Sequence, residues 1–251
     1  MTMGISAVII THNEQEFIGD CLKSLLPVVD EVVVLDSYST DQTEQICASY
    51  PLVRFIQHEW QGYSKSKNHG NEIAKHQFIL SLDADERLDQ LAADHILKLK
   101  NSGTLQGAYR LKRKNYYMNT WIRYSGWYPD SKVRLFDRNL AQWKGDYVHE
   151  TLVVDPRVEI IDLEGNIDHF TIKSPEDHIK TVEKYARLAA EKAISSGKKL
   201  RPLPSLLSAI AHFIKLFFIK LGVLHGQIGF RIAMNSARSK WLRYKYYKAK
   251  E

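Results

Sequence analysis

Four short apolar runs, separated by amphipathic stretches, mark the first 85 residues of the chain. They lie at 5–10, 31–35, 53–56 and 77–82. The first two are rich in β-branched residues and almost uniformly apolar, which is typical of strands that are buried on both faces. The pattern therefore predicts four strands of one sheet.

Between these runs the apolar positions recur with a helical period. The first such stretch contains Phe17, Ile18, Cys21, Leu22, Leu25 and Leu26, followed by Pro27. A second helix is predicted to begin at Ser39 or Thr40, which can cap it, and a third covers 64–76 despite Gly70. This alternation of strand and helix predicts an α/β fold with a mostly parallel, Rossmann-like sheet flanked by helices.

From about residue 104 the pattern changes. Residues 107–129 are aromatic and basic, and short strands are predicted at 132–138 and 147–154. Further helices are predicted at 175–195, 203–221 and 226–248. The first of these helices has Ser174 as its expected cap, with Asp177 three residues on.

The stretch 205–221 predicts an amphipathic helix. At about 100° per residue its polar side chains fall within an arc of about 140°. They are Ser205, Ser208, His212, Lys215 and Lys220. The opposite face carries Leu206, Ile210, Phe213, Ile214, Phe217 and Phe218. Because charges at the bilayer centre are costly, we expect this helix to lie in a membrane interface; the alternative is packing on the protein's own core.

Charge is distributed unevenly along the 251 residues. The net charge is +6, but residues 198–251 hold twelve lysine or arginine residues and one acid, Glu251, so that segment carries +11 and the rest −5. A basic tail favours an anionic surface. A tail that binds nucleic acid would not need so apolar a helix, so we expect residues 203–250 to contact an anionic membrane and no nucleic acid.

The cysteines and the first residues bear on the compartment. Cys21 and Cys47 both lie in predicted helices, so we expect them to be buried, in a reducing compartment, and not to bind a metal. The opening MTMGISAVII lacks the basic region of a signal peptide and is predicted to form a strand. These features predict a cytoplasmic protein, peripheral on the cytoplasmic face of the inner or plasma membrane.

Three acids stand within four residues at the end of the fourth strand, namely Asp83, Asp85 and Glu86. Carboxyl ends of parallel strands meet at one edge, so Thr11 and Asp36 are expected there too. Close carboxylates need a counter-charge, which Mg²⁺ or Mn²⁺ would supply while bridging to a diphosphate. The chain has neither G-x-x-x-x-G-K-[ST] nor G-x-G-x-x-G, which disfavours P-loop NTPases and dinucleotide enzymes and indicates a nucleotide-sugar enzyme.

Several longer segments carry a family resemblance. AVIITHNE, VVVLDSYSTDQT, W-x-G-Y-x-x-S-K-N and LSLDADE occur in this order, followed by GWYPDSKVRLF, GDYVHE and IDHF. Together they resemble family 2 glycosyltransferases of the GT-A fold, and among these the branch of lipopolysaccharide core β-glucosyltransferases. The resemblance covers roughly residues 5–190. It implies transfer of a sugar from a nucleotide-diphosphate donor, with a UDP-hexose favoured, to a glycolipid or oligosaccharide acceptor of the lipopolysaccharide-core type.

The resemblance also implies roles for individual residues. The implied nucleotide-sugar-binding residues are Thr11, Asn13, Glu14, Asp36, Lys67, Asn68, Asp83, Ala84 and Arg134. Arg134 would pair either with the phosphates or with the metal-binding acids. Asp36 would accept a hydrogen bond from the base. Asp85 is implied as the direct metal ligand, with Asp83 near the ribose and the metal and His169 as a late ligand. Many relatives carry Arg where this chain has Lys67.

An inverting transfer needs a carboxylate that takes the proton of the acceptor hydroxyl. Glu150 is the predicted base, with Asp146 and Asp130 as lesser candidates; a structural ion pair of Glu150 with Arg134 or Lys132 is the alternative. Glu86 is predicted to cap the following helix or to pair with Arg87, unless it has a functional role. Aromatic rings stack on sugars, so Trp127 and Tyr128 are predicted to contact the acceptor, together with His149.

The sequence predicts a separate function for each of three consecutive segments. Residues 1–103 would bind the nucleotide sugar, 104–172 would carry the acceptor site and the base, and 173–251 would associate with the membrane. Two other functions remain open at this point. A nucleotidyltransferase that makes a nucleotide sugar would need a Gly-rich basic loop after the first strand, which THNEQEF lacks. A catalytically inactive, membrane-tethered binding module is the non-enzymatic alternative.

Overall fold

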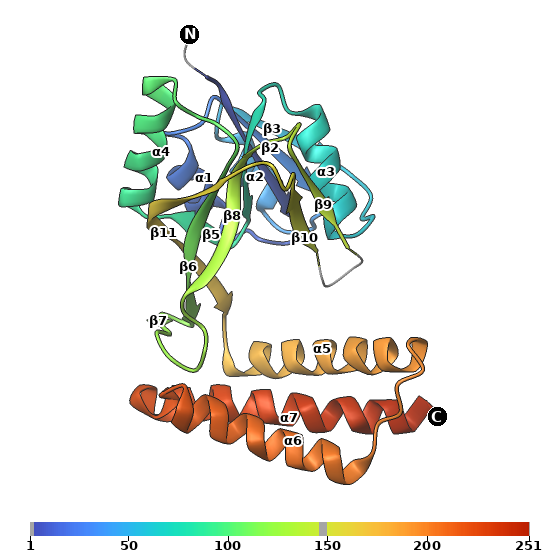
Figure 1. Ribbon diagram of the computed structural model, residues 1–251. Coiled ribbons are helices and arrows are strands. Elements are labelled where there is room, and N and C mark those ends of the chain that lie inside the picture. The colour runs from blue at the N-terminus through green and yellow to red at the C-terminus, as the bar shows by residue number, and fades with distance from the viewer. Residues whose placement is uncertain (1–2, 146–149, 251) are drawn as a thin grey trace. The chain divides into compact units, whose positions relative to one another are not determined.

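The computed structural model describes residues 3–145 and 150–250 (Figure 1). The chain forms two compact units. The first comprises Met1–Arg113 and Asp130–His169, and the second comprises Lys114–Pro129 and Phe170–Glu251. These boundaries differ from the division into 1–103, 104–172 and 173–251, whose functional assignment stays a prediction.

A mixed sheet forms the centre of the first unit, in the order β3-β2-β1-β4-β8-β6-β11-β5. Its parallel strands are β1 (Ile5–Thr11), β2 (Glu31–Asp36), β3 (Val53–Gln57) and β4 (Phe78–Asp83). Its antiparallel strands are β8 (Asp130–Asp137), β6 (Ala108–Tyr117), β11 (Ile160–Ile172) and β5 (Glu86–Leu88). The four predicted N-terminal strands are therefore confirmed, and the later strands make the sheet mixed rather than mostly parallel.

Helices cover both faces of this sheet, as predicted for an α/β fold. One face packs against α1 (Ile18–Leu25), α2 (Thr43–Ala48) and α4 (Gln90–Ser102). The other face packs against α3 (Tyr63–Ile73) and a separate hairpin of β9 (Ala141–Lys144) and β10 (Thr151–Val154). Alternate residues of β1 serve the two cores, with Ala7 and Ile9 on the first face and Val8 on the second.

Local signals explain where some of the helices begin. Asp89 caps α4 by accepting a hydrogen bond from the backbone N–H of Ala92 at 2.9 Å. The predicted capping of α2 by Ser39 or Thr40 is wrong, because Ser39 bonds to Asp36 instead and the helix begins later, at Thr43. Cys21 and Cys47 are buried free thiols, as predicted.

The second unit is built from helices and one short strand pair. It contains β7 (Thr120–Trp121), α5 (Pro175–Ser195), α6 (Pro202–Ile214), the π-helical turn η1 (Lys215–Ile219), the 3₁₀ turn η2 (Gly222–His225) and α7 (Gly226–Lys250). The bounds of α5 and its Ser174 cap are confirmed, since the Ser174 hydroxyl accepts from the Asp177 N–H at 3.0 Å. A small core of Tyr117, Ile122, Ile172 and Ile232 joins the 114–129 loop to α7.

An exposed apolar stripe runs along α6 and the two turns after it. It consists of Leu203, Leu206, Leu207, Ile210, Ile214, Phe218, Ile219, Leu221, Val223 and Leu224. Phe213 and Phe217, predicted on the same face, instead pack against Phe230 of α7 at ring distances of 5.7 and 5.8 Å. The π-helical turn breaks the regular period at Phe217, whereas Phe213 lies before this turn, in α6.

The basic charge of the tail is partly neutralised within the second unit. Arg238 lies 3.2 Å from Glu183, and Lys250 lies 2.6 Å from Glu191, both acids of α5. The segment Pro202–Ile219 has the length and apolarity of a membrane-crossing helix, and only 11% of it is buried.

Candidate active site

The carboxyl ends of β1, β2 and β4 meet at one edge of the sheet. Thr11 pairs with Asp36 across β1 and β2, and Ile10 pairs with Asp83 across β1 and β4. The structure thus brings Thr11, Asp36 and Asp83 together, as the parallel-strand pattern predicted. In an open α/β sheet this edge is where ligands bind.

The loops after β1 and β2 are bonded to each other and form a fixed rim at this edge. The N–H of Asn13 donates to the Ser39 hydroxyl at 2.8 Å, and the Thr40 N–H donates to the Asn13 side-chain oxygen at 2.8 Å. The Glu14 N–H donates to the Thr43 hydroxyl at 3.0 Å. Asn13 adopts a left-handed conformation with φ of 56°, which asparagine tolerates better than most residues.

The side chains of Asp36 and Thr11 differ in whether they have hydrogen-bond partners. Asp36 is completely buried, and its carboxylate accepts hydrogen bonds from the backbone N–H and the hydroxyl of Ser39. The nucleobase of a donor could therefore reach the Asp36 carboxylate only if Ser39 moved. The buried Thr11 hydroxyl has no hydrogen-bond partner within the part of the chain that the structure describes.

Asp83 is held between two cations. One carboxylate oxygen lies 2.8 Å from Lys67 Nζ, and the other lies 3.0 Å from an Arg134 guanidinium nitrogen. Burial opposes ionisation of Asp83, but the charges of Lys67 and Arg134 outweigh it and hold the pKa of the carboxyl well below its usual range. Asp83 is therefore a fixed anion whose counter-charge comes from the protein itself.

Both cations lie behind Asp83, away from solvent. The side chain of Lys67 is 2% exposed and that of Arg134 is 4% exposed, whereas that of Asp83 is 30% exposed. Lys67 also lies over the Trp143 ring, with Nζ 4.5 Å from the ring centroid. Both cations therefore position Asp83, and the pairing of Arg134 with an acid of the cluster agrees with one of its two expected roles. Direct contact of either residue with a nucleotide stays a prediction.

Glu86 connects this cluster to the neighbouring strands. It is completely buried, and one of its oxygens lies 2.6 Å from Arg134 and 2.9 Å from Arg113. Its other oxygen accepts the backbone N–H of Asp83 at 3.1 Å. The expected pairing with Arg87 is wrong, because Arg87 pairs with Asp20 at 3.1 Å. Sequence reasoning left open that Arg134 pairs with the acids but missed the parts played by Glu86 and Arg113. Two arginines on apolar strands were a signal that buried acids lie near them.

Asp85 and His169 lie beside this cluster, and both are partly exposed. The His169 Nε2 lies 3.3 Å from an Asp85 oxygen, and the two side chains are 13% and 25% exposed. The pairing of β5 with β11 sets this approach, because His169 is the register partner of Glu86. Ala84, between the two aspartates, is buried.

The residues present fit a divalent cation through two ligands. Within residues 3–145 and 150–250 no group of three or more His, Cys, Asp or Glu side chains could hold a metal by itself. Mg²⁺ and Mn²⁺ nevertheless bind through one or two protein ligands when phosphate oxygens and waters complete the shell. Asp85 and His169 suit that arrangement, whereas both oxygens of Asp83 already contact cations.

The candidate catalytic bases differ in their surroundings. Glu150 is half-buried and immediately precedes β10. Asp130 lies 2.6 Å from Arg113 and 3.1 Å from Lys132, which favours a structural role over a catalytic one. Asp146 and His149 lie outside the described residues. The predicted acceptor residues Trp127 and Tyr128 belong to the second unit, where both are half-buried.

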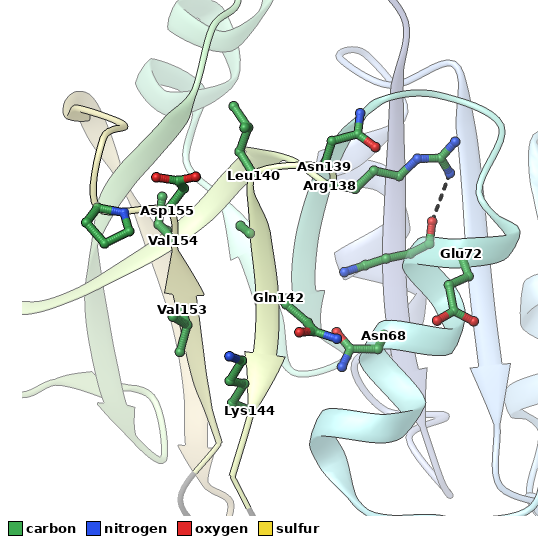
Figure 2. A pocket seen from close by; sticks show the side chains of 13 residues that line it. Asn68, Glu72, Arg138, Asn139, Leu140, Gln142, Lys144, Val153, Val154 and Asp155 are labelled. Atoms are coloured by element: carbon green, nitrogen blue, oxygen red, sulfur yellow. Dashed lines mark hydrogen bonds between the residues drawn. The ribbon is translucent and has the colours of Figure 1, made fainter.

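Asn68 bonds to the backbone of the β9–β10 hairpin, and its expected contact with the nucleotide stays a prediction. Its amide donates to the Trp143 carbonyl at 2.9 Å and accepts from the Trp143 N–H at 3.0 Å, which joins α3 to β9. Figure 2 shows Asn68 at the rim of a cavity of about 620 Å³ between α3 and the hairpin. Of the predicted donor-binding residues only Asn68 lines this cavity, so it is not the acidic site.

Comparisons with known proteins agree with this geometry. The model of glycosyl transferase family 2 matches residues 6–150. A lipopolysaccharide core biosynthesis glycosyltransferase, LpsC of Rhizobium meliloti strain 1021, is 30% identical over 243 residues, covering 93% of this chain and 87% of the relative. An uncharacterized glycosyltransferase of Rickettsia bellii strain RML369-C is 30% identical over 253 residues, covering 97% and 85%.

Among solved structures, residues 1–349 of S. aureus TarS match with a TM-score of 0.47 and 15% identity, over 99% of this chain and 92% of that one. The family match and the mixed sheet with helices on both faces confirm the GT-A fold class. The sequence match spans more than half of the chain, and a relative aligns over most of its length. The chain therefore belongs to glycosyl transferase family 2.

Proposed function

We propose that this glycosyltransferase is a metal-dependent, inverting enzyme that moves a hexose from a UDP-hexose donor to a glycolipid acceptor of the lipopolysaccharide-core type. The observation that carries the proposal is the partly exposed pair of Asp85 and His169, 3.3 Å apart, beside Asp83, whose pKa lies well below its usual range. This combination supplies ligands for a hard cation next to a fixed hydrogen-bond acceptor.

Donor binding divides among a few side chains. Asp85 and His169 would hold Mg²⁺ or Mn²⁺, which as a Lewis acid would stabilise the negative charge of the departing diphosphate. Asp83, fixed by Lys67 and Arg134, presents its exposed surface to a ribose hydroxyl. The unpartnered Thr11 hydroxyl at the same edge offers a further hydrogen bond to the nucleoside.

Transfer needs one proton acceptor from the chain. Glu150 would take the proton of the acceptor hydroxyl as its oxygen bonds to the anomeric carbon. The bond from that carbon to the diphosphate oxygen breaks, and UDP leaves with the bonding electron pair. Attack from the face opposite the leaving group inverts the anomeric configuration.

The second unit supports a membrane-borne acceptor. Its exposed apolar stripe offers surface to lipid, and the cations of residues 203–250 favour an anionic membrane. Peripheral attachment to the cytoplasmic face of the inner or plasma membrane would place enzyme and glycolipid on one surface. The name of the relative LpsC supports an acceptor from lipopolysaccharide core biosynthesis.

Calorimetric titration with UDP-glucose, with and without Mn²⁺, tests the donor site. We expect wild-type enzyme to bind the donor at least tenfold more tightly with Mn²⁺ and to hydrolyse it slowly when no acceptor is present. Asp85→Asn should abolish the effect of the metal. The exposed Asp94→Asn on α4 removes the same charge away from the site and should behave as wild type.

Two outcomes would contradict the proposal. Equal donor affinity with and without Mn²⁺ would refute metal dependence. Metal-dependent binding without release of sugar, even on membrane extract, would favour the inactive binding module over the enzyme.

A further inference from the structure

The cavity of about 620 Å³ between α3 and the β9–β10 hairpin is not used by the proposed donor site (Figure 2). Its volume is within the range of sites that hold small molecules. Glu72 and Asn68 lie on the helix side, and Lys144 and Val153 lie on the hairpin side. All the residues that line it belong to the first unit. The cavity is therefore large enough for a second small ligand besides the donor.

The hairpin has one packed face and one free face, as alternation along a strand requires. Ala141 packs in the core of the sheet, whereas Gln142, Lys144 and Val153 are exposed and line the cavity. Gln142 and Val153 are register partners, so their side chains leave the hairpin on the same face. The free face thus places an apolar side chain next to an amide.

The polar groups on the walls include both donors and acceptors. The side chains of Glu72, Gln142 and Lys144 form no hydrogen bond or ion pair with any residue that the structure describes. Asn71 is 5% exposed, and its side-chain oxygen has no partner among the described residues. Buried polar atoms of this kind are usually satisfied by a water or a ligand. The walls therefore present a carboxylate, two amides and an ammonium group to a ligand.

Charges of both signs on the walls restrict the charge of a ligand. Arg138 and Lys144 are the lining cations, and Glu72 and Asp155 are the lining acids. Asp155 is paired with Arg157 at 2.7 Å, and Arg138 donates to two backbone carbonyls at the end of α3. Glu72 would repel a phosphate, and Lys144 would repel an organic cation. The cavity therefore favours a neutral ligand.

A neutral sugar has the groups that these walls can bind. Each sugar hydroxyl both donates and accepts hydrogen bonds, so it can use a carboxylate, an amide and an ammonium group alike. The C–H groups of a sugar ring form an apolar surface, which suits the 43% exposed Val153. A purely apolar ligand would leave the polar groups without partners and is disfavoured.

The cavity adjoins the segment that carries the proposed base. Val153 follows Glu150 by three residues, which span at most about 11 Å when fully extended. One oligosaccharide can therefore contact Val153 and present a hydroxyl to Glu150.

We propose that this cavity binds a neutral sugar residue of the acceptor, next to the residue that receives the transferred hexose. Gln142, Glu72 and Lys144 bond its hydroxyls, and Val153 packs against the face of its ring. The inference rests on the proposed function and narrows it, because the acceptor must then carry at least two sugar residues.

Saturation-transfer NMR on the full chain, without donor or metal, tests this site. The probes are the neutral disaccharides maltose, cellobiose and gentiobiose, and the charged glucose 1-phosphate. Wild-type enzyme should bind at least one disaccharide, and about fivefold more tightly than glucose 1-phosphate. Gln142→Ala and Val153→Asp should each weaken binding of that disaccharide by about fivefold. Glu72→Gln should strengthen binding of glucose 1-phosphate, because the repelling carboxylate is gone.

Two variants elsewhere in the first unit are the matched controls. Leu52 is 43% exposed, as Val153 is, so Leu52→Asp introduces the same charge at an equally exposed apolar side chain. Gln106→Ala removes an exposed amide before β6. Both controls should bind the disaccharide as the wild type does. Absence of a signal from all three disaccharides would overturn the proposal. So would tighter binding of glucose 1-phosphate, or equal binding by Val153→Asp and Leu52→Asp.

Transfer kinetics connect the cavity to the acceptor. Val153→Asp should raise the amount of membrane extract needed for half-maximal transfer by about fivefold, while the maximal rate and the affinity for UDP-glucose stay unchanged. If Val153→Asp and Leu52→Asp needed the same amount of extract, the cavity would not bind the acceptor and the proposal would be wrong.

The NMR measurements do not depend on the donor site. Enzyme that binds a disaccharide in the cavity but neither binds nor hydrolyses UDP-glucose would refute the proposed transferase and leave a sugar-binding site standing. Enzyme that binds and hydrolyses UDP-glucose with Mn²⁺ but binds none of the disaccharides would refute the sugar site alone.

Discussion

The carboxylate of Glu86 lies 2.6 Å from the guanidinium of Arg134, and the two side chains are 0% and 4% exposed. Burying such a pair costs desolvation energy, so it contributes little to net stability. Its value here is geometric, because Arg134 in turn holds Asp83 and Glu86 accepts the Asp83 N–H. The pair therefore sets the position of the loop that leads to Asp85.

Glu86→Gln should damage both stability and the donor site. The change leaves Arg134 and Arg113 with less negative charge around them, and we expect a loss of about 3 kcal/mol in the free energy of unfolding. UDP-glucose should bind at least tenfold more weakly. Urea denaturation and calorimetry measure the two effects.

Glu31→Gln is the matched control. Glu31 is also buried and paired, with Arg54 at 2.9 Å and Ser6 at 2.8 Å, but it begins β2, at the end opposite Asp36. It should lose stability while keeping donor affinity. If both variants lost donor affinity equally, the positioning role of Glu86 would be refuted.

Asp83→Asn should make the free energy of unfolding depend less on pH in the acid range. The pKa of Asp83 in the folded protein is well below its ordinary value of 3.8, so its ionised form stabilises the fold above about pH 4. That stabilisation disappears as the pH falls through the lowered folded pKa. Urea denaturation from pH 7 to pH 2.5 should find the variant about 2 kcal/mol less stable at neutral pH, with the gap narrowing below pH 4.

Asp162→Asn provides the contrast for this titration. Asp162 also pairs with an arginine, Arg110, at 2.6 Å, but its side chain is 64% exposed, and solvent screens such pairs. Its effect should be much smaller at every pH. A constant gap between wild type and Asp83→Asn down to pH 2.5 would mean that the Asp83 pKa is not lowered.

Much of the fold follows from local patterns in the sequence. The β-branched runs specify β1 and β2, and the Ser174 cap with Gly197 beyond specifies α5, because these features act within a few residues. The gathering of Thr11, Asp36 and Asp83 follows from the geometry of parallel strands. Nothing local shows that the 114–129 loop belongs with the C-terminal helices, since that depends on contacts between distant residues.

The candidate site likewise depends on contacts between distant residues that the sequence does not reveal. The three acids of LSLDADE were expected to need an external cation. The structure supplies three internal ones, from α3, β6 and β8, namely Lys67, Arg113 and Arg134. Each comes from an element distant in sequence, and whether a lysine points inward or outward depends on packing, which the spacing of charges does not reveal. The π-helical turn in the tail is a further case, because no residue type in that segment predicts it.

Asn68→Ala should loosen the hairpin and slow turnover without changing donor affinity. Two hydrogen bonds to the Trp143 backbone would be lost, at about 1 kcal/mol each. Glu150 directly precedes β10, which pairs with β9 in this hairpin, so its position depends on the hairpin. Amide hydrogen exchange of Ala141–Lys144 and Thr151–Val154 should rise. Unchanged exchange together with weaker donor binding would restore Asn68 as a nucleotide ligand.

Glu150→Gln tests the base directly. The amide keeps the size of the side chain but cannot accept the proton of the acceptor hydroxyl at neutral pH, so we expect turnover to fall by at least 10²-fold, the lower range for loss of a general base. Donor affinity should stay within about twofold, because the proton acceptor is not needed to bind UDP-glucose. Sugar transfer to membrane extract and calorimetry separate the two quantities. The exposed Glu159→Gln, between β10 and β11, removes the same charge and should transfer sugar at the wild-type rate. Transfer at that rate by Glu150→Gln would show that another group takes the proton, and Asp146 would be the next residue to replace.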